Sequence, residues 1–313
     1  MASNSNYRAM ALLALVMVFW AGNSIVGRAV AGQIPPLTLA FIRWTGALLL
    51  LAPFAVAPLR RDWPELKRAW KPVLLLGLLG IGAFNSLLYS GLQFTTATNA
   101  LLLQAAVPGV VVLLDRLLFG LRSGAVQIVG TLATMVGVVF IVFEGDPARA
   151  LALHLGRGDA LVLVSVLVWS LYTVFLKLRP QVDPVSFVAV TFAIGVLTNA
   201  PMALWEWHEG LRIVWNTGTV LALVYVALFP SLVSYFIYNY AAAKLGAARA
   251  GQSITLLPVF GAFLSALLLG EVLHWHHAVG IALIGLGIAL GLVALRQQQA
   301  GGAARPARLE GKA

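Results

Sequence analysis

The sequence contains no cysteine and few charged residues. Only 10% of its 313 residues are charged, whereas a soluble domain carries roughly 25%. Without cysteine there is no disulfide bond, no thiolate nucleophile and no cysteine-ligated zinc site. The sequence also lacks an HExxH motif, and its acidic residues fall at the expected helix ends or in loops. We therefore expect neither a metal ion nor a cofactor.

Hydrophobic residues dominate what is present. They make up 60% of the chain, and the mean hydropathy is +0.91. The formal charge of +10 would suit a nucleic-acid partner if the basic residues formed one patch, but they are dispersed between apolar runs. The composition predicts an integral membrane protein whose surroundings are the lipid bilayer, with no nucleic-acid partner.

Apolar runs long enough to cross a hydrocarbon core of about 30 Å follow one another along almost the whole chain. We expect ten transmembrane helices. Their predicted ranges are 8–31, 36–58, 72–94, 97–118, 124–143, 158–178, 184–204, 217–242, 247–269 and 275–296. Most Lys and Arg residues then lie on one side of the membrane, which predicts that both termini are cytoplasmic. The expected location is the inner (plasma) membrane of a bacterium.

The two halves of the sequence repeat one another in their Pro, Gly and Trp residues. The matched pairs are Pro108 and Pro258, Gly120 and Gly270, Gly130 and Gly280, Gly137 and Gly287 and, at a slightly smaller offset, Trp20 and Trp169, Pro36 and Pro184, and Pro53 and Pro201. Each half would contain five helices, so the second half would enter the membrane upside down. The predicted fold class is an all-α membrane protein of ten transmembrane helices in two inverted five-helix repeats.

The same reading divides the chain into five parts. They are a cytoplasmic N-terminus (1–7), a first five-helix repeat (8–143), an extracytoplasmic linker (144–157), a second five-helix repeat (158–296) and a disordered cytoplasmic tail (297–313). The tail has no apolar periodicity, which is typical of disorder. No pattern in the sequence indicates an oligomeric state.

Several of these residues resemble a known family. The sequence resembles the EamA-type branch of the drug/metabolite transporter superfamily. The residues that carry the resemblance are Arg43 in the FIRW sequence, Pro258 preceding Leu268-Leu269-Gly270-Glu271, and Gly280. The resemblance extends over about residues 8–296 and is greatest to bacterial exporters of amino acids, particularly aromatic ones. It implies a central cavity between the halves, with the fifth and tenth helices peripheral. The first half departs from the pattern, because Leu121 follows Gly120 where the second half has Glu271.

Polar and aromatic stripes on four helices indicate which faces would line such a cavity. Trp20 and Asn23 share a helix face, as do Trp169 and Tyr172, because residues three or four apart lie on one side of a helix. The predicted lining residues are Trp20, Asn23, Asn85, Tyr89, Gln104, Trp169, Tyr172, Tyr235, Tyr238, Asn239 and Gln252. The alternative for each is a hydrogen bond between packed helices.

Three further residues carry two interpretations each. Pro108 and Pro258 would kink the fourth and ninth helices, either as gating elements beside the cavity or as tolerated packing kinks. Arg43 lies within the second span, where a charge is costly. It is a candidate carboxylate anchor or gate, or else a structural group bonded to nearby backbone carbonyls.

The lining suits a small amphipathic molecule, because rings would pack its apolar part and amides would orient its polar end. The sequence therefore predicts a secondary transporter that exports small metabolites, amino acids including aromatic ones, by alternating access. A multidrug or other metabolite exporter of the same fold and a passive channel are the alternatives. An intramembrane enzyme is disfavoured by the lack of a catalytic motif. Because no acid is expected at mid-membrane, we expect facilitated efflux without proton coupling.

Overall fold

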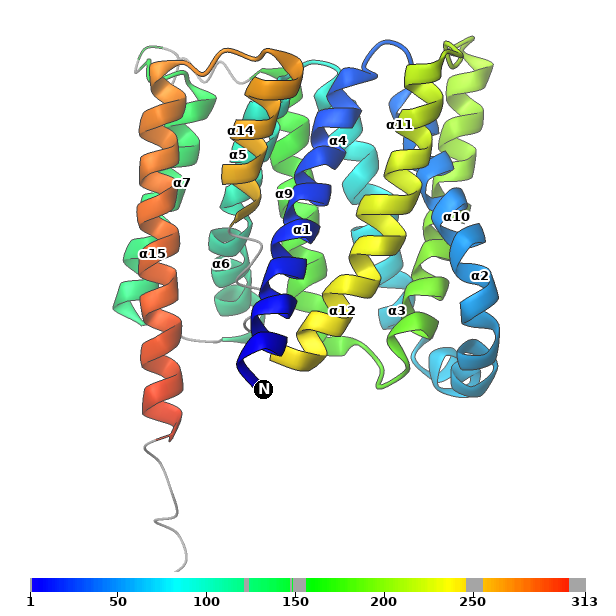
Figure 1. Cartoon of the computed structure of the whole chain (residues 1–313), viewed down its shortest axis with the longest axis horizontal. Coiled ribbons are helices and arrows are strands. Elements are labelled where there is room, and N and C mark those ends of the chain that lie inside the picture. Colours follow the sequence, from blue (N-terminus) through cyan, green and yellow to red (C-terminus); the bar gives the residue numbers. More distant parts are fainter. Residues whose placement is uncertain (1, 121–123, 147, 149–155, 246–255, 304–313) are drawn as a thin grey trace, which may run out of the picture.

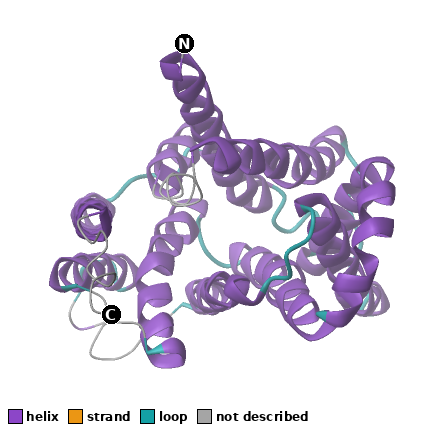
Figure 2. Cartoon of the chain, turned by 90° about the horizontal axis from the view of Figure 1, so that it is seen from below, coloured by secondary structure: helices purple, strands orange, loops and turns teal. Residues whose placement is uncertain are grey.

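The computed structural model describes residues 2–120, 124–146, 148, 156–245 and 256–303. Within these ranges every regular element is helical, as Figures 1 and 2 show from two directions. The elements are α1 (Ala2–Ala29), α2 (Pro36–Arg68), α3 (Trp70–Leu76), η1 (Gly77–Ala83), α4 (Phe84–Leu92), α5 (Ala97–Leu103), η2 (Gln104–Ala106), α6 (Val107–Phe119), α7 (Ala125–Val142), α9 (Arg157–Phe175), η3 (Leu176–Leu178), α10 (Pro184–His208), α11 (Thr217–Ala227), η4 (Leu228–Val233), α12 (Ser234–Leu245), α14 (Leu257–Leu269) and α15 (Trp275–Ala303). The all-α expectation is confirmed for the described chain.

Seven helical segments in the described chain are long and apolar enough to cross a membrane. They are Arg8–Ala29, Pro36–Arg68, Trp70–Leu92, Ala97–Phe119, Arg157–Leu178, Pro184–His208 and Thr217–Tyr238. The other three expected spans correspond to shorter apolar helices, Ala125–Ile141, Phe260–Leu269 and Trp275–Leu290. Part of the expected ninth span, residues 247–255, lies outside the described residues.

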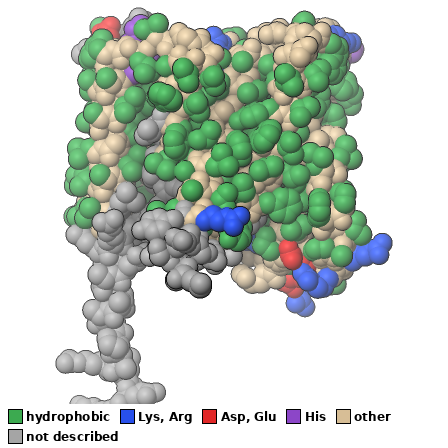
Figure 3. Space-filling view, viewed as in Figure 1, with side chains coloured by type: hydrophobic (Ala, Val, Ile, Leu, Met, Phe, Trp, Pro, Cys, Tyr) green, Lys and Arg blue, Asp and Glu red, His purple; other side chains and the backbone are tan. Residues whose placement is uncertain are grey.

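The surface agrees with a membrane-embedded bundle. In Figure 3 hydrophobic side chains cover the middle of the visible face, and most coloured charged groups lie near its upper and lower edges. Large apolar side chains such as Leu197 and Leu221 are exposed on helix sides. In lipid such exposure is favourable, because the solvent is itself apolar. The start of α1 and the end of α15 both lie at the lower edge (Figure 1).

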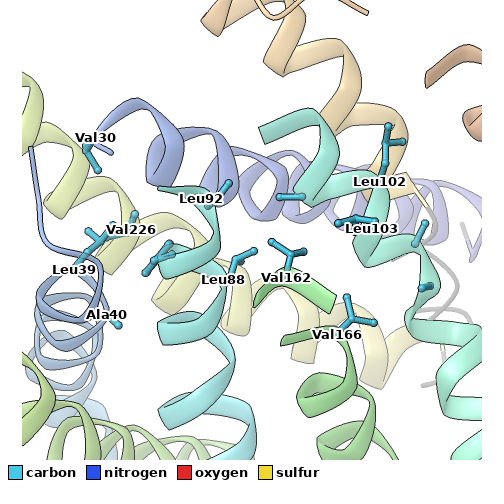
Figure 4. Close-up of a cluster of buried hydrophobic side chains, with 14 of the residues drawn as sticks. Val30, Leu39, Ala40, Leu88, Leu92, Leu102, Leu103, Val162, Val166 and Val226 are labelled. Atoms are coloured by element: carbon cyan, nitrogen blue, oxygen red, sulfur yellow. The ribbon is translucent and has the colours of Figure 1, made fainter. Parts of the chain in front are cut away.

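Helices from the two halves of the chain pack in pairs. α2 lies against α10, α7 against α15, α4 against α9, and α1 against both α12 and α14. The largest group of buried apolar side chains lies between α1, α2, α4, α5, α9 and α11 (Figure 4). This packing holds fixed the polar residues on α1, α2 and α4 that form the site described below.

The pair α7 and α15 depends on glycine. A Cβ atom at Gly137 would lie 2.9 Å from the carbonyl oxygen of Gly280, and one at Gly287 would collide with the carbonyl oxygen of Gly130. Each contact joins a glycine of the first half to a glycine of the second half, and the second contact is the first with the two halves interchanged. The matched glycines of the sequence repeat therefore have one physical reason, which is close approach of these two helices.

Carboxylates at helix ends cap the starts of neighbouring helices. Glu206, near the end of α10, accepts hydrogen bonds from the backbone N–H and the hydroxyl of Thr38 at the start of α2, both at 2.7 Å. Asp62, near the end of α2, accepts bonds at 2.8 Å from the backbone N–H of Asp183 and the hydroxyl of Ser186 at the start of α10. Free N–H groups and the helix dipole both favour a negative charge there.

Glu271 performs the same task between α14 and α5. Its carboxylate accepts bonds from the backbone N–H groups of Ala97 and Thr98, each at 2.8 Å, and from the Thr98 hydroxyl at 2.7 Å. The contact joins the two helices at the upper edge of Figure 1. Leu121, the position matched to Glu271 in the first half, lies outside the described residues.

Asp115 of α6 forms an ion pair with Lys177 of η3. One local expectation differs from the structure. The tail expected to be disordered from residue 297 is helical as far as Ala303, where Gln and Ala residues favour a helix. Residues 304–313, and most of the expected linker 144–157, lie outside the described residues.

Candidate functional site

Arg43 lies at the centre of a buried polar network. Its side chain is 5% exposed. Nη1 donates hydrogen bonds to Oδ1 of Asn23 at 2.5 Å, to Oδ1 of Asn85 at 2.8 Å and to the Tyr89 hydroxyl at 2.8 Å. Nε donates to the hydroxyl of Ser231 at 2.9 Å. These partners are side-chain oxygens on α1, α4 and η4, and among the described residues none of the bonds goes to a backbone carbonyl, which was the structural alternative for Arg43.

No carboxylate neutralises this guanidinium within the described part of the chain. The ion pairs there join Arg61 to Asp62 and Asp183, Arg68 to Glu65, and Lys177 to Asp115. Arg43 is therefore stabilised by the dipoles of neutral groups alone. A buried charge normally has a partner of opposite charge, so this arrangement differs from that of a structural ion pair.

Trp44 adjoins the guanidinium. The guanidinium carbon of Arg43 lies 4.5 Å from the centroid of the Trp44 ring, within the range of a cation–π contact. The Trp44 side chain is 1% exposed, and its Nε1 donor has no hydrogen-bond partner among the described residues. Most buried donors are hydrogen-bonded, so an unpaired one in a native structure calls for an explanation.

A cavity of about 80 Å³ adjoins both residues. It is lined by Trp20, Asn23, Ser24, Arg43, Trp44, Gly80, Phe84, Asn85, Leu88, Gln104, Val107, Trp169, Pro230, Tyr235 and Leu257. Sites that enclose a drug-sized molecule measure roughly 300–1,000 Å³. In this conformation the cavity has room for a few water molecules, and a larger ligand requires the helices or side chains to move apart.

Aromatic rings form two walls of the cavity. The ring centroid of Trp169 lies 4.7 Å from that of Phe84 and 5.0 Å from that of Tyr172. On the other wall the Trp20 ring lies 5.6 Å from that of Tyr238. Because each tryptophan is held by further rings, the two can present flat apolar faces in fixed orientations.

Two π-helical segments bring backbone to the cavity at matched places in the two halves. η1 contributes Gly80 and η4 contributes Pro230 to the lining. A Cβ atom at Gly80 would lie 2.6 Å from the Tyr172 ring, so only glycine fits there. The carbonyl of Pro230 accepts a bond from Trp20 Nε1 at 3.0 Å. π-helical turns inside α-helices are frequently found at functional sites.

The predicted lining residues fall into three groups. Trp20, Asn23, Asn85, Gln104, Trp169 and Tyr235 lie in the cavity wall. Tyr89 reaches the network through Arg43, while Tyr172 and Tyr238 pack beside the two wall tryptophans. Gln252 and the side chain of Asn239 lie outside the described residues.

The prolines mark helix starts rather than helix middles. The span Ala97–Phe119 is interrupted by the 3₁₀ turn η2, and Pro108 is the second residue of α6, which follows it. Pro258 is likewise the second residue of α14. A proline has no N–H to donate to the preceding turn, so an α-helix cannot continue unbroken through it. The break in the fourth span thus precedes Pro108.

Sequence reasoning missed Trp44 and the π-helical segments. The glycines of η1, at positions 77, 80 and 82, and Pro230 within η4 stand out in the sequence, but none of them by itself requires a π-helical turn. Among the described residues no group of three or more His, Asp or Glu side chains is arranged to hold a metal ion.

The sequence matches the EamA-like transporter family twice, over residues 7–143 and 156–293. It is 29% identical over 284 residues to an uncharacterized transporter of Archaeoglobus fulgidus, covering 88% of this chain and 94% of that protein. It is 33% identical over 270 residues to an uncharacterized protein of Pseudomonas aeruginosa, with coverage of 85% and 88%. The transporter YetK of Bacillus subtilis, also uncharacterized, is 25% identical over 295 residues, with coverage of 92% and 88%.

The fold is also similar to that of a protein of known crystal structure. The TM-score is 0.61 at 21% sequence identity, and the match covers 93% of this chain and 99% of the other. The family and the Archaeoglobus and Bacillus relatives are described as transporters and not as enzymes. Together with the seven long apolar helices, these matches show that the chain is a multi-pass membrane transporter that belongs to the EamA-like transporter family.

Proposed function

We propose that this transporter exports small amphipathic metabolites, namely amino acids including aromatic ones, by alternating access. The substrate would pass through the cavity beside Arg43 and Trp44. The observation that carries the proposal is the composition of the cavity wall. Trp20 and Trp169 supply apolar faces, while Asn23, Asn85 and Arg43 supply polar groups in the same small space. Such a wall can hold a molecule with an apolar body and a polar end.

We also propose that the chain forms ten transmembrane helices in two inverted repeats, residues 8–143 and 158–296. The family matches divide the chain at nearly the same point. Reciprocal caps support a two-fold relationship between the halves. Glu206 of α10 caps the start of α2, and Asp62 of α2 caps the start of α10. The two π-helical segments, which lie at matched positions in the two halves and each contribute a residue to the cavity lining, support it as well. Inverted repeats allow one unit to adopt, in turn, the conformation of the other.

Both termini are proposed to be cytoplasmic, in the inner membrane of a bacterium. The start of α1 and the end of α15 share the lower edge of the bundle (Figure 1). The basic residues between positions 60 and 71 belong to the end of α2 and the start of α3, and cytoplasmic loops are enriched in Lys and Arg. Export then proceeds toward the edge where Glu271 joins α14 to α5.

The small cavity volume supports alternating access over an open pore. At about 80 Å³ the cavity offers less space than an aromatic amino acid would need. A substrate must therefore be admitted by a movement of the surrounding helices. A passive channel would instead retain a continuous polar path.

Efflux from proteoliposomes tests this function. Vesicles containing the purified protein are preloaded with a panel of labelled amino acids or with cationic dyes, and release is compared with that from protein-free vesicles. Saturable release of amino acids, with competition between them, is expected. Release of dyes alone would indicate a multidrug exporter, and single-channel currents would indicate a channel.

Substitutions at the cavity connect the activity to the site. Alanine at Trp20, Trp169, Tyr89 or Asn239 should reduce release while leaving folded protein in the membrane. Alanine at Leu197, which is 73% exposed on the outside of α10, is the matched control. Unchanged kinetics for all four cavity variants would refute the proposed lining.

A further inference from the structure

The polar groups around the cavity are arranged as donors. Asn23 and Asn85 turn their amide oxygens to Nη1 of Arg43, and the Asn23 oxygen also accepts a bond from the Tyr89 hydroxyl. Their Nδ2 groups donate no hydrogen bond within the described part of the chain, and neither does Nη2 of Arg43. Trp44 Nε1 likewise has no partner there. Trp44 Nε1 is thus the one fully buried side-chain donor of the described residues that lacks an acceptor, and it belongs to the residue beside the Arg43 guanidinium.

The cavity wall also carries a net positive charge. Among the described lining residues Arg43 is the single charged one, and none is Asp or Glu. Both the charge and the unpaired donors favour a ligand that brings negative charge and acceptor oxygens. A cation in the same place would be repelled by the guanidinium and would leave the donors unpaired.

We propose that Arg43 and Trp44 form a carboxylate-binding corner, and that the transported molecules are recognised by their carboxylate rather than by an amino group. This inference rests on the proposed export function and narrows it. Nη2 of Arg43 and Nε1 of Trp44 supply donors from adjacent residues of α2. A carboxylate has two oxygens and can accept from both. The ammonium group of an amino acid is then tolerated but not required, and organic cations are excluded.

The aromatic walls fix the remainder of the ligand. Trp169, Phe84 and Trp20 lie in the same cavity wall as Arg43. A carboxylate held at the corner leaves the apolar part of the molecule to contact these rings. The favoured class is therefore an aromatic or aliphatic monocarboxylate of modest size, in amino or deaminated form.

Three probes that differ only in their polar ends test this inference. They are L-phenylalanine, 3-phenylpropionate and 2-phenylethylamine, which carry respectively both charges, the negative charge alone and the positive charge alone at neutral pH. Binding to the purified full-length protein is measured as a shift of the unfolding temperature, which avoids leakage of the probes through vesicles. Both acids should bind, and the amine should bind at least about tenfold more weakly.

Variants assign the effect to the corner. Arg43→Gln should abolish the preference for acids, and Arg43→Lys, which keeps the charge, should restore part of it. Trp44→Phe removes the donor and keeps a ring, so it should weaken both acids several-fold. Trp215→Phe is the matched control, because Trp215 is 67% exposed and lies outside the cavity.

The wild-type protein alone can overturn the inference, even if a variant fails to fold. Equal or tighter binding of the amine would refute the carboxylate corner, while efflux of phenylalanine from proteoliposomes would leave the export function standing. Equal binding of the acids by wild-type protein and by Trp44→Phe would exclude Trp44 from the corner. Absence of both binding and efflux for all three probes would refute the export function and the corner together.

Discussion

Replacing Glu271 with glutamine should open the cavity toward the edge at which this residue lies. The carboxylate joins α14 to the start of α5 through three hydrogen bonds, two from backbone N–H groups and one from the Thr98 hydroxyl. Alternating access requires that the helices part on one side while they close on the other. A contact that exists only when the Glu271 edge is closed would stabilise that closed state.

The size of the effect follows from the contacts. Loss of a helix cap costs roughly 0.5–2 kcal/mol, and each hydrogen bond to a charged group contributes about 1.5–3 kcal/mol. Glutamine retains one acceptor oxygen, so only part of the contact with the buried residues Ala97 and Thr98 is lost. We expect a net loss of about 1–2 kcal/mol, which corresponds to a shift in the conformational equilibrium of roughly 5- to 30-fold.

The absence of native cysteine makes the assay direct. A single cysteine at Ser24, in the cavity wall, is labelled with a membrane-impermeant maleimide added from the Glu271 side. The rate of labelling should rise in the Glu271→Gln background. Glu206→Gln is the control, because it removes a similar cap between α2 and α10, which pack together along the bundle and are expected to stay paired.

An unchanged labelling rate in the Glu271→Gln protein would refute the reasoning. It would mean that Glu271 caps α5 in both conformations and has no part in closure. A rise of equal size in the Glu206→Gln protein would also refute it, because general loosening of the bundle would then explain the result.

Three further predictions follow from the fold. Pro108→Ala and Pro258→Ala each restore a backbone donor at the start of a helix. In an inverted repeat the two substitutions should therefore open the cavity toward opposite faces of the membrane. Cysteine labelling from each side would show whether the two shifts are opposite. Gly137→Ala places a Cβ atom 2.9 Å from the Gly280 carbonyl oxygen, and thermal unfolding should show a loss of stability of about 1–3 kcal/mol. Gly285→Ala is the control, because Gly285 has open space around it and its substitution should cost no stability. Efflux at a fixed substrate gradient should persist when the proton gradient is collapsed, and a strict requirement for that gradient would contradict facilitated transport.

Local signals in the sequence predicted much of the fold. Gly120 and Gly270 match in the repeat because both end helices in the left-handed conformation, with φ of 65° and 64°. Pro36 and Pro184 match because both begin helices. Each of these requirements is met within a few residues of chain, so the sequence alone can reveal it.

The π-helical segments could not be predicted in this way. η1 and η4 each change the helical register in the middle of an apolar run, and no residue type requires that change. At Gly80 the reason is the ring of Tyr172, which comes from another helix. The register change therefore depends on tertiary packing and not on a local preference.

Trp44 was missed for a related reason. Adjacent helix residues point about 100° apart, so a reading based on helix faces places Arg43 and Trp44 on different sides of α2. In the structure both line the cavity, because α1, α4 and η4 surround the guanidinium with oxygen atoms while the indole lies beside it. Which face of a membrane helix meets a cavity is decided by its neighbours.

The network around Arg43 also shows why a buried charge can be retained without an acidic partner. Asn23, Asn85 and Tyr89 fix the guanidinium from within the first half of the chain, and Ser231 adds a bond from the second half. An acidic residue in their place would neutralise the charge permanently and would compete with a carboxylate for the same donors. Neutral oxygens hold the group in position but leave its charge available, and they join the two halves of the chain beside the cavity.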